Sequence, residues 1–342
     1  MRDDQWNRLL ATMDGQVHDP LPCGFIIDSP WLPGWYGVDI IEYLSSECVW
    51  LDANRRVLET FPDIWFLPGF WSEFGMCTEP SAFGARCVFP RNEFPSAEKA
   101  IRNLDQIMDM KTPNPSTDGL LPMVLYRLKW AQPRIEELGH RIRFSVSRGP
   151  FNVASFLMGM TEFLMALKTK PESIHRLLRI VTDFLASWHE LQRSSFPSID
   201  GMLILDDIIG FVSEKDFMEF ALPYMRQLYQ AEVRVKFFHN DAACAQSIRY
   251  YPEIGINLYN PGVQTPLPAL RALSGHRMTI LGNIPPLNVL ARGAPGDVSA
   301  AVHTLLSETP DRSRLILSCA GGMPPGVTTG NLAAFLDEVR KH

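Results

Sequence analysis

The chain lacks several features that define common protein classes. None of its apolar runs approaches the roughly 20 residues of a membrane span, and the polar start Met1–Gln5 is followed by no signal-peptide core. Its 32 lysines and arginines are outnumbered by 38 acidic residues and form no cluster, which argues against a nucleic-acid partner. We therefore expect a cytoplasmic protein with neither a nucleic-acid nor a membrane partner.

Motifs built on cysteine or glycine are also missing. The six cysteines are widely scattered and form no CxxC pair, so a disulfide framework, a zinc ribbon and a dithiol redox motif are not expected. No GxGxxG follows an expected strand, and no GxxxxGK phosphate loop is found. Each cysteine is therefore taken as a small buried hydrophobe unless its position argues otherwise.

Aromatic residues are concentrated in the first part of the chain. Hydrophobic residues make up 46% of the sequence, enough for a large core. Six of the eight tryptophans lie in residues 1–110, several of them in the proline- and glycine-rich stretches 30–37 and 65–71. Because proline and glycine interrupt regular elements, we predict an irregular aromatic cover here, either a hydrophobic wrap or a ligand-stacking surface.

From residue 142 onward, short aliphatic runs alternate with stretches of helical periodicity. The expected strands are 141–147, 202–206, 233–239, 255–260, 278–282 and 315–319. The expected helices include 171–194, 214–229, 298–306 and 331–341. Repeated strand–helix units predict a parallel sheet with helices outside it.

A closed (β/α)₈ TIM barrel of the α/β class fits this pattern better than an open sheet, because both nucleotide-binding loops are missing. Two further strands are then needed, before residue 142 or after residue 200. We expect one domain over 1–342, with 1–110 as the N-terminal cover and helices and 111–342 as the main barrel repeats. Barrel enzymes carry their chemistry at the C-terminal ends of the strands.

Polar residues gather where the expected strands end, whereas the strand interiors are aliphatic. The set consists of Arg148, Asp206, Asp207, His239, Asp241, Tyr259, Asn260, Asn283 and Cys319. Arg148 suits a carboxylate or phosphate group. Successive strand residues face opposite ways, so only one of the two adjacent aspartates is expected to face the mouth.

His239 and Asp241 are the sharpest element of this set. Side chains two apart on an extended segment point to the same side, so both can reach one divalent metal ion. They could equally form an acid–base dyad, or Asp241 could cap a helix. Cys319 could complete a metal site or pack below a glycine turn, and Cys244 is a weaker alternative ligand.

Several segments together resemble the uroporphyrinogen decarboxylase superfamily. They are Ser81–Ala85, Gly149–Phe151, Asp206–Gly210, Phe238–Asp241, Asn257–Pro261, Leu281–Asn283 and Ser318–Gly326. The chain looks closer to the corrinoid-dependent methyltransferase branch than to authentic uroporphyrinogen decarboxylases. It has no N-terminal arginine-rich motif of the decarboxylase type, and Ala320–Gly322 stands where those enzymes have Gly-His-Gly.

The resemblance implies a TIM barrel and a zinc-dependent transfer of a methyl group between a small molecule and the corrinoid (cobalamin) of a partner protein. In the coenzyme M branch, zinc is bound by a His-x-Cys motif and a late cysteine. Here His239 and Asp241 occupy that motif, and Cys319 lies about two residues from the late position.

The roles expected on this basis divide the strand-end residues into three groups. The zinc ligands would be His239, Asp241 and Cys319; the catalytic residues Asp206, Asp207 and His239; and the substrate-binding residues Arg148, Tyr259, Asn260 and Asn283. One alternative is a cofactor-free decarboxylase, in which an aspartate stabilises positive charge and Arg148 binds a carboxylate. Another is a non-catalytic corrinoid- or tetrapyrrole-binding module. The sequence does not identify the methyl donor or acceptor, and a homodimer is one of the assemblies considered.

Overall fold

The computed structural model describes residues 1–27 and 29–342. Ten strands are present in this part of the chain: β1 (Cys23–Ile26), β2 (Ile64–Leu67), β3 (Cys87–Val88), β4 (Ser96–Ala97), β5 (Phe144–Arg148), β6 (Gly201–Leu205), β7 (Val235–Asn240), β8 (Leu258–Pro261), β9 (Thr279–Leu281) and β10 (Leu315–Ile316). The α-helices of the N-terminal half are α1 (Asp3–Met13), α2 (Leu32–Tyr36), α3 (Ile40–Ser45), α4 (Glu47–Thr60), α5 (Gln106–Asp109), α6 (Leu121–Glu137), α7 (Pro150–Met158) and α8 (Met160–Thr169). The remaining ones are α9 (Pro171–Ser195), α10 (Glu214–Asp216), α11 (Leu222–Leu228), α12 (Leu267–Leu273), α13 (Pro295–Glu308) and α14 (Thr329–Val339).

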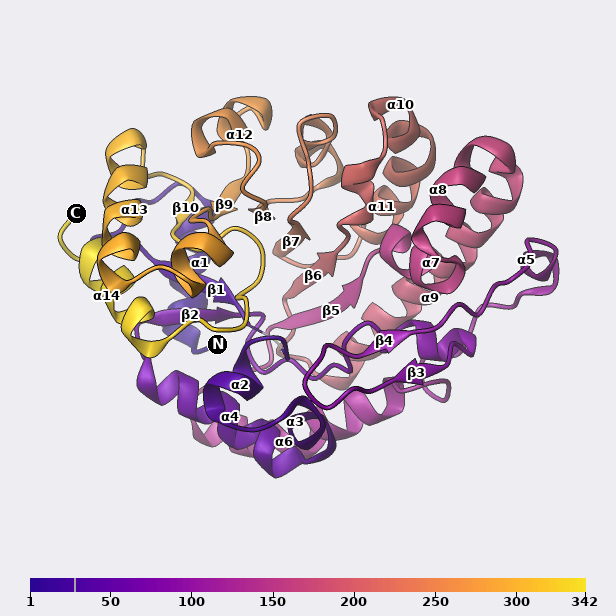
Figure 1. Cartoon of the computed structure of the whole chain (residues 1–342), viewed down its shortest axis with the longest axis horizontal. Coiled ribbons are helices and arrows are strands. Elements are labelled where there is room, and N and C mark those ends of the chain that lie inside the picture. The colour runs from indigo at the N-terminus through magenta and orange to yellow at the C-terminus, as the bar shows by residue number, and fades with distance from the viewer. Residues whose placement is uncertain (28) are drawn as a thin grey trace.

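Eight parallel strands form the barrel, and helices surround them (Figure 1). Strands β5 to β10 make a six-stranded sheet in chain order, and β1 pairs with β2. A parallel bridge between Cys23 and Leu317 joins β1 to the end of β10, so the spatial order runs from β2 through β1 and β10 to β5. This arrangement confirms the predicted TIM-barrel class.

The barrel is split between β2 and β5, because no ladder bonds join these two strands among the described residues. The free edge of β5 is satisfied by side chains instead. The Val146 N–H donates to Oε1 of Gln192 at 2.9 Å, and Nε2 of Gln192 donates to the Val146 carbonyl at 3.1 Å. The Arg148 N–H donates to a carboxylate oxygen of Glu79 at 3.0 Å. An edge strand whose polar groups are paired in this way leaves few unsatisfied groups inside the protein.

The barrel interior below the C-terminal ends of the strands is filled with apolar side chains. The strands contribute Ile26, Trp65, Leu67, Phe144, Val146, Leu203, Leu205, Val235, Phe237, Leu258, Leu281 and Ile316 to one buried cluster. Helix α1 adds Trp6, Leu9 and Met13 to this cluster, and the Trp6 ring meets the Phe144 ring edge-on at 5.5 Å. Because Phe144 is the first residue of β5, this contact shows that α1 closes the N-terminal end of the barrel. The C-terminal end is not covered by α1.

Residues 1–110 do more than cover the barrel. They supply β1 and β2, and Trp65 points into the barrel interior from β2. Trp6 and Trp50 lie on the regular helices α1 and α4. The proline- and glycine-rich stretches are only partly irregular, because 65–71 begins in β2 and 30–37 contains the short helix α2. Just before α2, Nε1 of Trp31 donates to the Val327 carbonyl at 3.0 Å. We propose, as the sequence suggests, that 1–342 is a single barrel domain.

No single helix in the described residues is long and apolar enough to cross a membrane; by length and composition, only the sharply bent pair α7 and α8 passes such a test.

Candidate functional site

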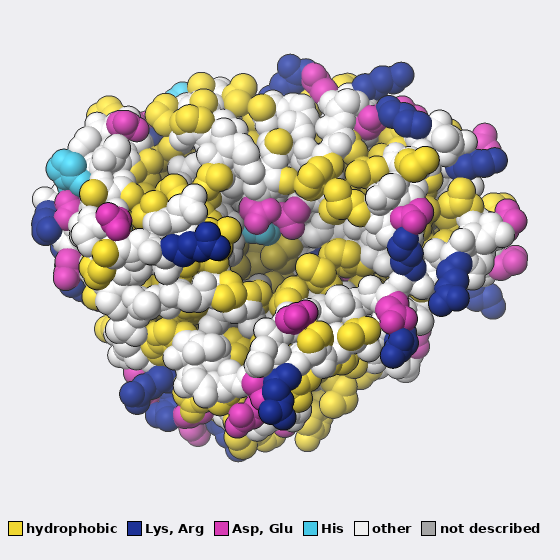
Figure 2. Space-filling view, in the orientation of Figure 1, with side chains coloured by type: hydrophobic (Ala, Val, Ile, Leu, Met, Phe, Trp, Pro, Cys, Tyr) yellow, Lys and Arg dark blue, Asp and Glu magenta, His cyan; other side chains and the backbone are white. Residues whose placement is uncertain are grey.

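The polar residues predicted at the strand ends follow directly on the apolar interior. In β7 and β8, alternate residues face the barrel, so that His239 follows Phe237 and Asn260 follows Leu258 on the inner side. Figure 2 shows a hollow in the middle of this face, with acidic side chains and a histidine at its edge. The polar layer at the C-terminal mouth is therefore the candidate site.

Asp207, His239 and Asp241 come together at this mouth. One donor atom from each side chain lies within 4.8 Å of the other two. Nε2 of His239 is 3.5 Å from Oδ1 of Asp207, and the Asp241 N–H donates to the same oxygen at 3.0 Å. Burial and, as the second cause, the nearby charge of Asp207 raise the pKa of Asp241 above its usual value. Two crowded carboxylates beside an imidazole form an arrangement that a cation would stabilise.

Asn260 fixes the orientation of the histidine. Its Oδ1 lies 2.7 Å from Nδ1 of His239, and its Nδ2 donates to the carbonyls of Leu281 at 2.7 Å and Cys319 at 3.3 Å. Because the amide nitrogen faces two carbonyls, the amide oxygen must face the imidazole, and Nδ1 of His239 carries the proton. In neutral His239, the lone pair of Nε2 then points to the two aspartates and is available to a metal ion.

Asp207 is held in place from its other side. Nδ2 of Asn152 lies 3.5 Å from Oδ2 of Asp207 and also contacts the Leu205 carbonyl. Oδ1 of Asn152 accepts from the Ile208 N–H at 3.1 Å, which fixes the start of the following loop. One oxygen of Asp207 therefore faces His239, while the other faces Asn152. The donor set of one imidazole and two carboxylates suits Zn²⁺ and other divalent ions of similar preference.

Asp206 has a different role from its neighbour. It is completely buried, and its two carboxylate oxygens each accept a 2.9 Å hydrogen bond from the N–H groups of Phe151 and Asn152 in the first turn of α7. There is no room for a side chain at position 149, because a Cβ added to Gly149 would lie 2.2 Å from Oδ2 of Asp206. Asp206 thus ties α7 to β6, and of the two adjacent aspartates only Asp207 belongs to the group at the mouth.

The structure does not place Arg148 for binding a substrate carboxylate. Its side chain is 7% exposed and lies between Glu73 and Glu79, with N–O distances of 3.5 and 3.4 Å. Glu73 also accepts from the Gly75 N–H at 2.6 Å and from the Ser29 hydroxyl. The two glutamates compensate the buried charge of the guanidinium. They lie far from Arg148 in the sequence, so its position at a strand end gave no sign of them.

Tyr259 and Asn283, which were also predicted to bind substrate, donate hydrogen bonds to backbone carbonyls of neighbouring segments. Tyr259 points away from the barrel interior, packs against Phe238 with ring centroids 5.9 Å apart, and donates to the Asn240 carbonyl at 3.3 Å. Its position next to Asn260 in the sequence therefore places it on the opposite face of β8. Asn283 is half-buried, and its Nδ2 donates to the carbonyls of Gly262 at 3.4 Å and Thr265 at 3.1 Å. It positions the loop after β8.

Neither cysteine considered as a ligand belongs to the group at the mouth. Cys319 is completely buried, with its Sγ 3.6 Å from the Gly321 carbonyl, and burial raises the pKa of its thiol to about 12. Cys244 is also buried, and its Sγ lies 4.0 Å from the Thr265 hydroxyl. The third donor at the mouth is Asp207, which was expected among the catalytic residues but not among the metal ligands.

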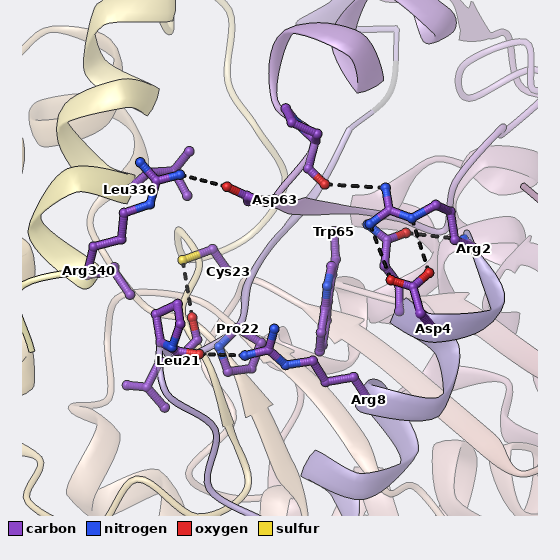
Figure 3. A pocket seen from close by; sticks show the side chains of 14 residues that line it. Arg2, Asp4, Arg8, Leu21, Pro22, Cys23, Asp63, Trp65, Leu336 and Arg340 are labelled. Carbon is purple, nitrogen blue, oxygen red and sulfur yellow. Dashed lines mark hydrogen bonds and ion pairs between the residues drawn. The ribbon is translucent and has the colours of Figure 1, made fainter. Parts of the chain in front are cut away.

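A second hollow lies at the opposite, N-terminal end of the barrel (Figure 3). It has a volume of about 250 Å³ and is bordered by residues preceding β1 and β2, by α1 and by α14. Three arginines border it, and two of them already face acidic partners: Arg2 pairs with Asp4, and Arg340 pairs with Asp63. Because barrel enzymes act at the other end, we do not assign the chemistry to this hollow.

Comparisons with known proteins show relatives of two kinds. The uroporphyrinogen decarboxylase of Tolumonas auensis is 23% identical over 278 residues, covering 77% of this chain and 76% of that protein. The methylated-thiol–coenzyme M methyltransferase of Methanosarcina mazei is 23% identical over 218 residues, covering 64% of this chain and 58% of that protein.

Solved structures agree on the fold. A methyltransferase from Methanosarcina mazei superposes with a TM-score of 0.81 at 18% identity, covering 98% of this chain and 97% of that one. A B12-independent methionine synthase from Shewanella sp. W3-18-1 superposes with a TM-score of 0.57 at 10% identity, covering 94% of this chain and 98% of that one. Residues 68–342 match the sequence profile of the uroporphyrinogen decarboxylase (URO-D) family, so the chain belongs to that family, as its sequence motifs predicted.

Proposed function

We propose that this chain is a metal-dependent methyltransferase that moves a methyl group between a small molecule and the corrinoid of a partner protein. The observation that carries the proposal is the group of Asp207, His239 and Asp241 at the mouth of the barrel. One of the two kinds of relative, the methylated-thiol–coenzyme M methyltransferase, supports the same class of reaction.

Zinc is the ion we propose for this group. His239 Nε2 and one oxygen each from Asp207 and Asp241 would hold it, in place of the cysteine-containing set expected from the sequence. When bound there, the ion would act as a Lewis acid that activates a thiol or a methyl donor at neutral pH. Asn260 and Asn152 would keep the imidazole and one carboxylate in their binding orientations, which is the usual task of groups behind metal ligands.

The competing decarboxylase hypothesis is less well supported, because two of its three candidate residues, Arg148 and Asp206, have other partners in the structure. It required Arg148 to bind a substrate carboxylate, but Arg148 already lies between two buried glutamates. It also required an aspartate to stabilise positive charge on the substrate, and Asp206 instead caps α7. Asp207 is still available for that role, so the two activities must be separated by experiment.

A direct test is methyl transfer from free methylcobalamin to a panel of small thiols, with the untagged protein reconstituted with Zn²⁺. The wild-type protein should demethylate the corrinoid, and a chelator should abolish the activity. His239→Ala should reduce the rate by about 100-fold or more, because even removal of groups behind a ligand costs 10–100-fold.

Tyr259→Phe serves as the matched control, because this residue is adjacent to Asn260 in sequence but points away from the mouth. Its rate should stay close to that of the wild-type protein. Release of CO₂ from carboxylated tetrapyrroles or aromatic acids by the metal-free protein, without methyl transfer, would contradict the proposal and favour the decarboxylase.

A further inference from the structure

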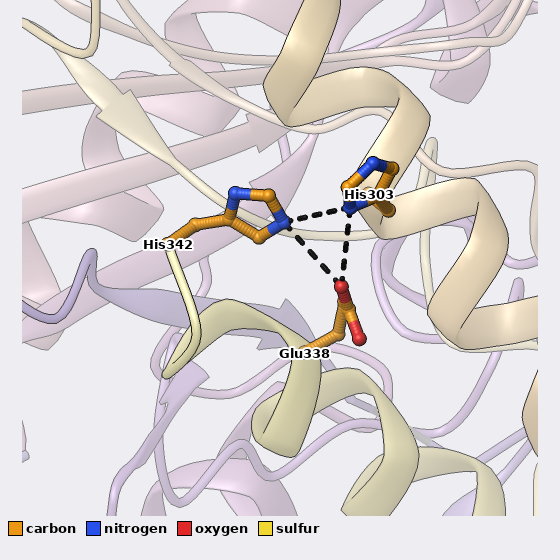
Figure 4. Close-up of side chains that lie close together, drawn as sticks. All are labelled: His303, Glu338 and His342. Atoms are coloured by element: carbon orange, nitrogen blue, oxygen red, sulfur yellow. Dashed lines mark hydrogen bonds and ion pairs between the residues drawn. The ribbon is translucent and has the colours of Figure 1, made fainter.

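A second group of side chains that could hold a metal ion lies away from the barrel mouth, on the outer helices. His303 comes from α13, Glu338 from the last turn of α14, and His342 from the residues that follow α14 (Figure 4). The three side chains converge, and one donor atom from each lies within 4.8 Å of the others.

The distances among these atoms match those of a metal coordination shell. Nδ1 of His303 is 3.0 Å from Nε2 of His342, and these nitrogens lie 3.4 and 3.3 Å from the same oxygen, Oε1 of Glu338. Ligands about 2.0–2.1 Å from a tetrahedral zinc ion are about 3.3 Å from one another. The three atoms therefore already form one face of such a tetrahedron.

The carboxylate is held in the orientation that a single-oxygen ligand needs. Nζ of Lys341 donates to Oε2 of Glu338 at 2.7 Å, which leaves Oε1 facing the two imidazoles. The Glu338 side chain is 9% exposed, whereas the His303 side chain is 60% exposed. The site thus has a fixed buried carboxylate on one side and is open to solvent, and to a fourth ligand such as water, on the other.

The backbone places the last ligand without strain. The His342 N–H donates to the Val339 carbonyl at 3.3 Å, which continues the turn after α14 and puts His342 four residues after Glu338. Residues four apart lie on the same face of a helical turn, so only His303 must come from a second element. A bound ion would therefore join α13 to the end of α14.

We propose that His303, Glu338 and His342 form a second divalent-metal site, selective for zinc-like ions, which clamps the end of α14 against α13. Imidazole nitrogens with one carboxylate suit Zn²⁺ better than Mg²⁺ or Ca²⁺, which prefer oxygen ligands. The site is independent of the proposed methyltransferase activity, because it lies outside the mouth and shares no residue with it. Its role is structural, since it joins two outer helices.

The test measures Zn²⁺ binding by calorimetry to untagged, chelator-treated protein in which His239→Ala and Asp241→Asn have removed the mouth site. This protein should still bind one equivalent of Zn²⁺. Adding His303→Ala should weaken that binding by at least about tenfold, and Glu338→Gln should also weaken it. His276→Asn is the matched control, because it removes another exposed histidine and asparagine tolerates its positive φ of 56°.

Hydrogen exchange supplies a readout that does not depend on activity. Zn²⁺ should slow exchange at the end of α14 in the His239→Ala/Asp241→Asn protein but not after His303→Ala. An unchanged melting temperature without metal would show that this exposed substitution preserves the fold. The proposal is wrong if the protein lacking the mouth site binds no Zn²⁺, or if it binds equally well with and without His303.

Discussion

Asn260 offers the most informative single substitution at the mouth, because one side chain links the proposed metal ligand to the barrel wall. Asn260→Ala would remove a 2.7 Å hydrogen bond to Nδ1 of His239 and two bonds to the Leu281 and Cys319 carbonyls. Each buried polar group left without a partner costs about 1–3 kcal/mol. We expect the free energy of unfolding of the metal-free protein to fall by about 2–4 kcal/mol, allowing for relaxation.

The effect on metal binding has a separate cause. Without Asn260, His239 is free to rotate and to place its proton on either nitrogen, so Nε2 is no longer held toward Asp207. Loss of a partner behind a metal ligand typically reduces affinity 10–100-fold, which corresponds to about 1.4–2.7 kcal/mol. Competition with a chromophoric chelator measures the Zn²⁺ affinity, and urea denaturation of the metal-free protein measures the stability.

Tyr259→Phe separates the two effects. It removes one 3.3 Å hydrogen bond on the opposite face of the same strand, so it should cost about 1 kcal/mol of stability without changing Zn²⁺ affinity. If Asn260→Ala lowered stability but the variant bound Zn²⁺ as tightly as the wild-type protein, Asn260 would not orient the metal ligand.

Three further predictions concern the framework around the site. Gln192→Leu leaves the Val146 N–H and carbonyl without partners at the barrel split and should cost about 2–4 kcal/mol, with faster exchange of the Val146 amide. Arg148→Met leaves two glutamates buried without their cation and should cost about 3–5 kcal/mol by urea denaturation; a neutral result would contradict the ion-pair account. Burial lowers the pKa of His189 from 6.5 to about 3, so only the unfolded chain gains this proton between those values. Stability therefore falls as the pH drops from 6.5 to 3, and His189→Gln should reduce that slope by about 1.4 kcal/mol per pH unit, while an unchanged slope would be contrary evidence.

The strands and helices after residue 142 could be predicted because the apolar residues that give their periodicity are the ones that pack in the core. The expected strand 202–206 is shifted by one residue from β6, and the helix expected at 171–194 is α9. Strands β1 and β2 were hidden because each has only four residues, all of them buried. Such short strands give no alternating pattern, and the surrounding tryptophans and prolines indicated an irregular cover instead.

The site was predictable in composition but not in detail. The sequence indicated that polar residues gather at the strand ends and that only one of two adjacent aspartates faces the mouth. It could not indicate that Asp207 joins His239, because that depends on the register in which Leu205 lies opposite His239 across β6 and β7. Side chains on consecutive residues face opposite sides of a strand, which is why Tyr259 and Asn260 have different roles.

Long-range partners explain the remaining differences. Glu73 and Glu79 precede Arg148 by about seventy residues, so nothing near the arginine indicated that its charge is already compensated inside the protein. Cys319 was expected as a metal ligand from the sequence resemblance. However, its thiol faces the Gly321 carbonyl and is completely buried.

The proposed function requires the mouth of the barrel to bind a divalent metal ion through Asp207, His239 and Asp241. Anomalous diffraction at the zinc edge, from crystals of untagged protein grown with Zn²⁺, tests this claim most directly. We expect a peak about 2.0–2.2 Å from Nε2 of His239 and from an oxygen of each aspartate. Zinc density on the outer helices alone, with none beside His239 in fully loaded crystals, would contradict it.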